Sequence, residues 1–225
     1  MPLRRRRLLP SWHHRRNRSI DHSPVGRMGA DAFRVHPCPF SSLAQLKASQ
    51  MPIVRPLNGH TPSFGKENFL AETAVIVGDV QMGDGCSVWY NAVLRGDVNF
   101  IRIGHRVNIQ DNATLHCTYQ KCGLTIGNDV SIGHNAVVHG CTVEDKVLIG
   151  MGAIVMDQAV IGAGSVIAAG AVVTQGMVVE PGSLMAGVPA KRIGAVGKAL
   201  AEGEIERIAR NYGLYASWYG EGHNS

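Results

Sequence analysis

Three histidines have the residue type and the spacing for a transition-metal site. His116 and His134 are eighteen residues apart, and His139 follows His134 by five. Three neutral imidazoles can hold a divalent metal and leave it one open position for water or substrate. They could equally be exposed turn histidines on a regular scaffold. His105 has the same offset within its repeat as His134, so the pattern by itself does not separate the two interpretations.

A six-residue repeat runs through the segment that carries these histidines. Large aliphatic residues recur every six positions from Leu70 to Val173, with register slips near Phe100 and near residue 140 and an interruption by a short loop from Cys117 to Gly123. A small or β-branched residue follows each by four, as with Ala74 and Thr142. A period of six places the aliphatics on no single face of an α-helix. The repeat therefore predicts an all-β fold, a left-handed parallel β-helix with three short strands per coil and aliphatics stacked inside.

The coil length decides how the histidines would be placed. Eighteen residues make one turn of a three-sided prism, so His116 and His134 are predicted to lie side by side on neighbouring coils, with His139 on the next face. Adjacent faces of one prism point apart, and three ligands could converge on one metal only if two prisms share the site. A cyclic trimer would carry three such sites at its interfaces.

The chain divides into three predicted parts. Residues 51–194 form the β-helix, and residues 195–225 form a C-terminal helix and tail. The helix is expected from Lys198 to Trp218, because its apolar residues fall roughly on one side, and it would pack along a prism wall. Residues 1–50 form a disordered basic extension, since they are Arg-rich, interrupted by proline and without periodicity.

Charge is distributed unevenly between these parts. Residues 1–50 hold ten Lys and Arg against two acids, whereas the remainder holds twelve against fifteen. The folded part therefore lacks the basic patch that nucleic-acid binding needs. The extension fits three interpretations: an organellar transit peptide, a basic arm for an acidic partner, or an upstream extension with the working protein starting at Met51.

Two further features bear on the cellular setting. No apolar run approaches the roughly 18 residues of a membrane span, so no membrane association is expected. The five cysteines show no paired spacing typical of a disulfide framework. These features favour a reducing compartment, and we predict a cytoplasmic protein.

A series of short motifs lies along the repeat between Val88 and Gly194. In order, they are Leu94-Arg95-Gly96-Asp97, Asn108-Ile109-Gln110-Asp111-Asn112, Leu115-His116, Gly133-His134-Asn135, Val138-His139-Gly140 and Ala186-Gly187-Val188-Pro189-Ala190-Lys191. In combination they resemble the γ-class carbonic anhydrases and their hexapeptide-repeat relatives, over about half of the chain.

The resemblance implies a metal site and a reaction. It assigns His116, His134 and His139 as ligands and leaves out His105. By analogy, His116 and His139 come from one subunit of a homotrimer and His134 from the next. The implied metal is Zn²⁺, with Fe²⁺ or Co²⁺ as alternatives, and the implied reaction is hydration of CO₂ to bicarbonate by a metal-bound hydroxide.

The resemblance also assigns roles around the metal. Arg95 and Asp97 match the family's ion pair across the trimer interface, and Asp111 matches another interface position. Gln110 matches the side chain that hydrogen-bonds the metal-bound water.

The chain lacks acidic residues at two places where the family pattern has them. Val98 follows Asp97, and the loop from Cys117 to Gly123 contains no acid, although the family's prototype carries glutamates at these places that are thought to relay a proton. Proton export would then need buffer, a water chain or another group such as Tyr212, although the spacing of Tyr212 also fits hydrophobic packing. Two other functions therefore stay open: a trimeric metal-binding scaffold of weak or no activity that binds a protein partner, and a coenzyme A-dependent hexapeptide acyltransferase.

Overall fold

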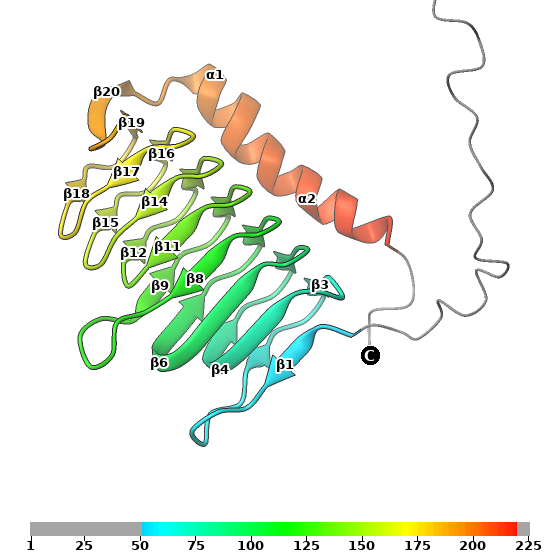
Figure 1. Ribbon diagram of the computed structural model, residues 1–225. Helices are drawn as coiled ribbons and strands as arrows, with labels where there is room; N and C mark the ends of the chain where they lie inside the picture. Colours follow the sequence, from blue (N-terminus) through cyan, green and yellow to red (C-terminus); the bar gives the residue numbers. More distant parts are fainter. Residues whose placement is uncertain (1–50, 220–225) are drawn as a thin grey trace, which may run out of the picture. The chain divides into compact units, whose positions relative to one another are not determined.

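The computed structural model describes residues 51–219 (Figure 1). Short parallel strands follow one another around three walls, and one helical segment follows at the C-terminal end. The predicted all-β, left-handed parallel β-helix with a C-terminal helix is confirmed. The predicted basic extension lies outside the described residues, and the boundaries at 50 and 194 stay predictions.

The three walls are stacks of parallel strands. The first, which we call the helix wall, contains β3 (Phe69–Leu70), β5 (Ser87–Val88), β7 (Asn108–Ile109), β10 (Ser131–Ile132), β13 (Leu148–Ile149), β16 (Val166–Ile167) and β19 (Ser183–Ala186), with β20 (Lys191–Ala195) antiparallel at its end. The second, the open wall, contains β1 (Ile53–Arg55), the first halves of β4 (Val75–Met82) and β6 (Val93–Ile103), β8 (Thr114–His116), β11 (Val137–His139), β14 (Ile154–Val155) and β17 (Val172–Val173).

The third wall begins where β4 and β6 continue around a corner. It contains β2 (Ser63–Phe64), the second halves of β4 and β6, β9 (Leu124–Ile126), β12 (Thr142–Val143), β15 (Val160–Ile161) and β18 (Val178–Val179). Gly78 lies at the bend of β4 with a φ of 77°, and a Cβ there would lie 2.3 Å from the carbonyl oxygen of Gly96. This corner therefore requires glycine.

The repeated aliphatic residues form the core, as the sequence predicts. Ile76, Leu94, Ile132 and Ile161 are all fully buried inside the prism. Thr142, which the repeat predicts to point inward, is instead exposed, and Cys141 takes the inward position. Strand alternation explains this difference, because Thr142 directly precedes the inward-pointing Val143 and must face the other side.

The C-terminal segment lies along the helix wall (Figure 1). It consists of α1 (Lys198–Leu200), the π-helical η3 (Ala201–Glu206) and α2 (Arg207–Ser217). Tyr212 packs edge-on against Trp89 of the wall, with ring centroids 5.2 Å apart. The outward side chains of Ser87 and Ser131 are buried as well. The predicted helix and its packing along a wall are confirmed.

Two further findings concern the described residues. None of their helices is long and apolar enough to cross a membrane. The four cysteines among them, Cys86, Cys117, Cys122 and Cys141, are free thiols.

Candidate metal centre

Two of the predicted ligands lie face to face. His116 ends β8 and His139 ends β11, and the two residues are directly opposite in the parallel register of the open wall. Nδ1 of His116 and Nε2 of His139 are 3.0 Å apart. We call them the histidine pair, which lies at the corner between the open wall and the third wall.

The register of this coil differs from the one that the spacing predicts. The prediction that His116 and His134 lie side by side is wrong. The loop Cys117–Gly123 is inserted between β8 and β9, closed by a bridge between Thr118 and Cys122. It lengthens the coil, so that His116 lies opposite the residue 23 positions later, which is His139.

His134 lies at the opposite edge of the open wall. It follows β10, where the chain turns from the helix wall into the open wall, and the next residue, Asn135, has a left-handed φ of 58°. Asparagine tolerates this conformation better than most residues. The buried Gln110 holds the turn: its Oε1 accepts the His134 N–H at 3.2 Å, and its Nε2 donates to Asn108 at 3.0 Å.

Each of the three imidazoles has a carboxylate at one nitrogen. Metal-binding histidines commonly have such a partner, which orients the ring and leaves the other nitrogen for the metal. The pairs are His116 Nε2 with Asp97 Oδ1 at 3.1 Å, His139 Nδ1 with Asp157 Oδ1 at 2.5 Å, and His134 Nδ1 with Asp111 Oδ2 at 2.8 Å. Of these carboxylates, Asp157 was not predicted from the sequence, where the available signal was its position eighteen residues, one coil, after His139.

The electrostatics around His116 are set by burial and by an ion pair. Arg95 and Asp97 of β6 are paired within one chain at 2.5 Å. Burial by itself would raise the pKa of Asp97, but hydrogen bonds from Arg95 and His116 outweigh it and hold that pKa below its ordinary value. Burial, aided by the charge of Arg95, lowers the pKa of His116. Both shifts favour a neutral imidazole beside an ionised carboxylate, the protonation state that a metal ligand needs.

Tyr212 of α2 lies beside His134, with its hydroxyl 3.3 Å from Nε2. Burial and the nearby charge of Asp111 raise the pKa of Tyr212 to about 12, so the phenol stays protonated at neutral pH. Next to this contact is a cavity of about 430 Å³, lined by Gln110, His134, Tyr212 and the apolar Leu148 and Met151, among others. The structure thus brings together Gln110, His134 and Tyr212, and separately Arg95, Asp97, His116 and His139.

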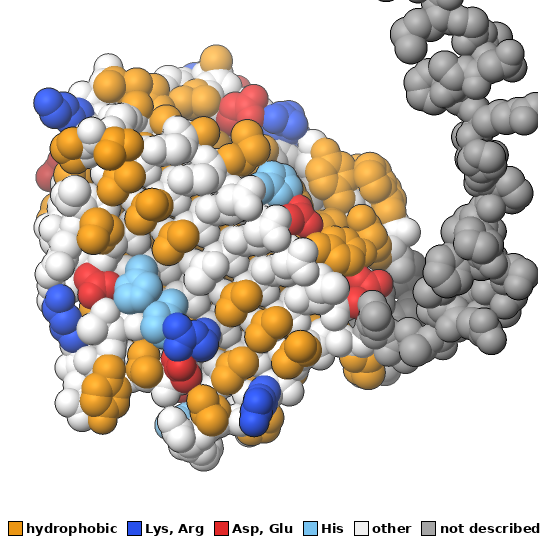
Figure 2. Space-filling view, viewed as in Figure 1, with side chains coloured by type: hydrophobic (Ala, Val, Ile, Leu, Met, Phe, Trp, Pro, Cys, Tyr) orange, Lys and Arg blue, Asp and Glu red, His pale blue; other side chains and the backbone are white. Residues whose placement is uncertain are grey.

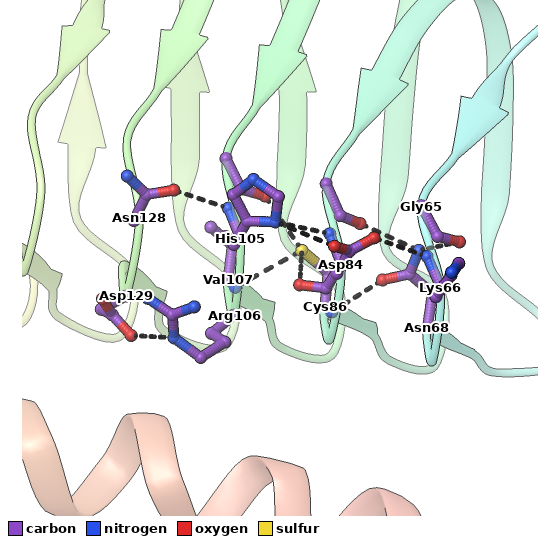
Figure 3. A network of polar contacts seen from close by, with 12 residues as sticks. Gly65, Lys66, Asn68, Asp84, Cys86, His105, Arg106, Val107, Asn128 and Asp129 are labelled. Atoms are coloured by element: carbon purple, nitrogen blue, oxygen red, sulfur yellow. Dashed lines mark hydrogen bonds and ion pairs between the residues drawn. The ribbon is translucent and has the colours of Figure 1, made fainter.

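His105 has a different role, which the spacing could not reveal. The Nδ1 of its ring accepts the backbone N–H of Asp84 at 3.0 Å, and the backbone N–H of His105 donates to Oδ1 of Asn128 at 2.9 Å (Figure 3). These contacts belong to a ladder of turn side chains that link successive coils at the corner between the third wall and the helix wall. Nδ1 of His105 thus serves to hold the scaffold.

We expect His105→Ala to weaken the fold without affecting metal binding. The substitution removes the acceptor for one backbone N–H at a partly solvated corner, a loss of about 0.5–1.5 kcal/mol. Urea unfolding in chelator should show this decrease, while the metal content of the purified protein stays equal to that of the wild type. A loss of bound metal would contradict the structural role of His105.

The open wall carries apolar side chains between its two histidine-bearing edges. One row of outward-facing residues runs across successive strands of this wall, each in register with the next, and all of them are partly or fully exposed. They are Val75, Val93, Thr114, Val137, Ile154 and Val172. Figure 2 shows hydrophobic side chains in regular rows over this face, with histidines and acidic side chains among them. Within one chain, the described residues contain no group of three or more His, Cys, Asp or Glu that could hold a metal.

Several proteins similar to this chain are named carbonic anhydrases. A protein of Methanocaldococcus jannaschii named "Probable carbonic anhydrase" is 58% identical over 142 residues, which cover 63% of this chain and 86% of that protein. A carbonic anhydrase of Geobacillus kaustophilus is 43% identical over 170 residues, covering 74% of this chain and 91% of that protein. A mitochondrial γ carbonic anhydrase of Arabidopsis thaliana is 48% identical over 100 residues, which span 36% of its length. The chain belongs to the γ-carbonic-anhydrase-like hexapeptide-repeat family.

Other matches of this chain carry transferase names. Residues 140–175 match the family model described as bacterial transferase hexapeptide (six repeats). A solved structure of a hexapeptide transferase family protein from Anaplasma phagocytophilum is 39% identical, with a TM-score of 0.71 over 75% of this chain and 98% of that chain. Membership of the γ-carbonic-anhydrase-like family therefore settles the fold, whereas the reaction must be argued from the site.

Proposed function

We propose that this protein is a metal-dependent carbonic anhydrase that hydrates CO₂ at sites shared between the subunits of a homotrimer. The observation that carries this proposal is the close carboxylate partner on each of His116, His134 and His139, at 3.1, 2.8 and 2.5 Å. The scaffold histidine His105 differs, because its Nδ1 accepts the backbone N–H of Asp84 and the Asp84 carboxylate lies farther away, at 3.5 Å. The carbonic anhydrase names of the relatives support the same reaction.

The placement of the histidines supports sharing between subunits. The histidine pair and His134 lie at opposite edges of the open wall, so one copy's His134 edge can meet the next copy's pair when the walls pack in a closed ring. The apolar side chains between these edges suit such an interface, because burying them stabilises association. Arg95 and Asp97, which adjoin the pair, would then lie at the same interface.

The donor set fits the proposed metal. Three neutral imidazoles suit Zn²⁺, and also Fe²⁺ or Co²⁺. When bound, the ion supplies a Lewis acid that lowers the pKa of water towards about 7 and so provides a nucleophile for CO₂ at neutral pH. Each imidazole is oriented by its own carboxylate: Asp97 orients His116, Asp111 orients His134 and Asp157 orients His139. Gln110 and Tyr212 place an amide and a hydroxyl beside His134, where they can orient water or bicarbonate.

The test is stopped-flow CO₂ hydration by the full chain loaded with Zn²⁺ or, under anaerobic conditions, with Fe²⁺. We expect activity in the parent, none in His116→Ala, and parental activity in the matched scaffold variant His105→Ala. The assay should be run over a range of buffer concentrations, because Val98 and the loop Cys117–Gly123 supply no acid to carry the proton away. A parent with about one metal per subunit but no activity at any buffer concentration would refute the proposal.

Acyl transfer is the second candidate, because the matching family model and a solved relative carry transferase names. This function requires binding of acyl-coenzyme A, and it gives no role to the three His–Asp pairs. Calorimetric titration with acetyl-coenzyme A distinguishes the two candidates: saturable binding that survives His116→Ala would favour the transferase. Metal binding with neither reaction would instead leave the scaffold function.

A further inference from the structure

Asp157 is the centre of a small network beside the histidine pair. It lies in the turn that follows β14, on the coil after His139, and its side chain is only 15% exposed. One oxygen, Oδ1, faces Nδ1 of His139 at 2.5 Å. The other, Oδ2, accepts a hydrogen bond from the Thr118 hydroxyl at 2.7 Å and lies 3.7 Å from Nζ of Lys121.

Both of these other partners come from the inserted loop. Thr118 and Lys121 belong to Cys117–Gly123, which reaches across to the turn after β14 to contact Asp157. Burial by itself would raise the pKa of Asp157, but hydrogen bonds from Thr118 and His139 outweigh it and keep that pKa below its ordinary value. The loop, which lacks an acid of its own, thus surrounds an acid supplied by another coil.

The contact fixes the chemistry of His139. An ionised carboxylate only accepts hydrogen bonds, so Nδ1 of His139 must carry the proton and donate it to Asp157. This contact leaves Nε2, the nitrogen that faces His116 at 3.0 Å, as the ring nitrogen available to a metal. Without Asp157 the ring could adopt the other tautomer or rotate, and either change would remove one donor from the pair.

We propose that Asp157, held by Thr118 and Lys121, is the positioning residue that sets the tautomer and orientation of His139 for metal binding. This inference rests on the proposed function, because it assigns to the loop Cys117–Gly123 a part in building that metal site. Asp157 touches neither substrate nor metal and acts through His139 alone.

Cobalt binding tests this inference without measuring activity. The full chain, stripped of metal, is titrated with Co²⁺ while the visible d–d absorption is recorded. Loss of a carboxylate partner of a ligand histidine typically weakens metal affinity 10–100-fold, and we expect a loss of about that size in Asp157→Ala. Asp157→Asn retains an acceptor oxygen and should lie between Asp157→Ala and the parent. Thr118→Val keeps Asp157 but loosens it, and a loss of a few-fold is expected.

The control is Asp129→Ala, which breaks an ion pair of similar length with Arg106 on another corner and should leave Co²⁺ affinity unchanged. If Asp157→Ala fails to fold by circular dichroism, Asp157→Asn and Thr118→Val decide the question. Parental affinity and an unchanged spectrum in the folded variants would overturn the positioning role while leaving the metal site intact. A parent that binds Co²⁺ no better than His116→Ala would instead overturn the proposed function, and this inference with it.

Discussion

Subunits carrying His134→Ala and subunits carrying His139→Ala are each expected to lack bound metal and CO₂ hydration, and to regain both when they are assembled together. The histidine pair and His134 lie at opposite edges of one wall, so no chain can complete a site with its own residues in the proposed arrangement. A mixed interface can combine an intact pair from the His134→Ala subunit with an intact His134 from the His139→Ala subunit.

The extent of recovery follows from the symmetry of a cyclic trimer. In an equal mixture, each interface has the correct subunit on both sides about one time in four, so about a quarter of the parental metal content and activity should return. The measurement is metal content and stopped-flow CO₂ hydration after co-refolding, with size-exclusion chromatography to check the trimer. Recovery should not occur when His116→Ala and His139→Ala subunits are mixed, because both lesions lie in the same pair. Recovery in the mixture of His116→Ala and His139→Ala would refute sites shared in this way. The absence of recovery in the mixture of His134→Ala and His139→Ala would refute them as well.

Replacing Ile132 with alanine is expected to give the largest loss of stability. Ile132 is fully buried in the middle of the prism and lies in register between Ile109 and Ile149 of the neighbouring coils. Removing most of its side chain leaves a cavity that two coils share, at a cost of about 2–5 kcal/mol. Because each coil is stabilised mainly by its neighbours, a break in the middle should weaken both halves.

Urea unfolding with chelator present and at one fixed protein concentration measures this loss without a contribution from metal binding. The matched control is Thr125→Ala, at an exposed position of β9 on the third wall, which should change stability by no more than about 0.5 kcal/mol. A loss for Ile132→Ala as small as that of the control would show that the stacked aliphatics contribute less than their burial indicates.

The sequence by itself determined the architecture of this protein. A six-residue period of aliphatic residues has one simple solution, in which each aliphatic lies inside a three-sided coil, and Ile76, Ile132 and Ile161 lie there. The amphipathic pattern of the C-terminal segment likewise determined a helix along one wall. Both signals are local, and the six-residue pattern is repeated many times, so an error at one position, such as Thr142, does not change the result.

The tertiary structure decided which residues meet. A short inserted loop changed one coil from eighteen to 23 residues, and His116 consequently lies opposite His139 and not beside His134. The contacts of His105 with Asp84 and Asn128 separate it from His134, although the two share one offset in the repeat. Asp157 was recognised only through its contact with His139. The repeat predicts for most positions, Thr142 excepted, whether a side chain points in or out. The partners of an outward side chain depend instead on the register between coils, which a single insertion resets.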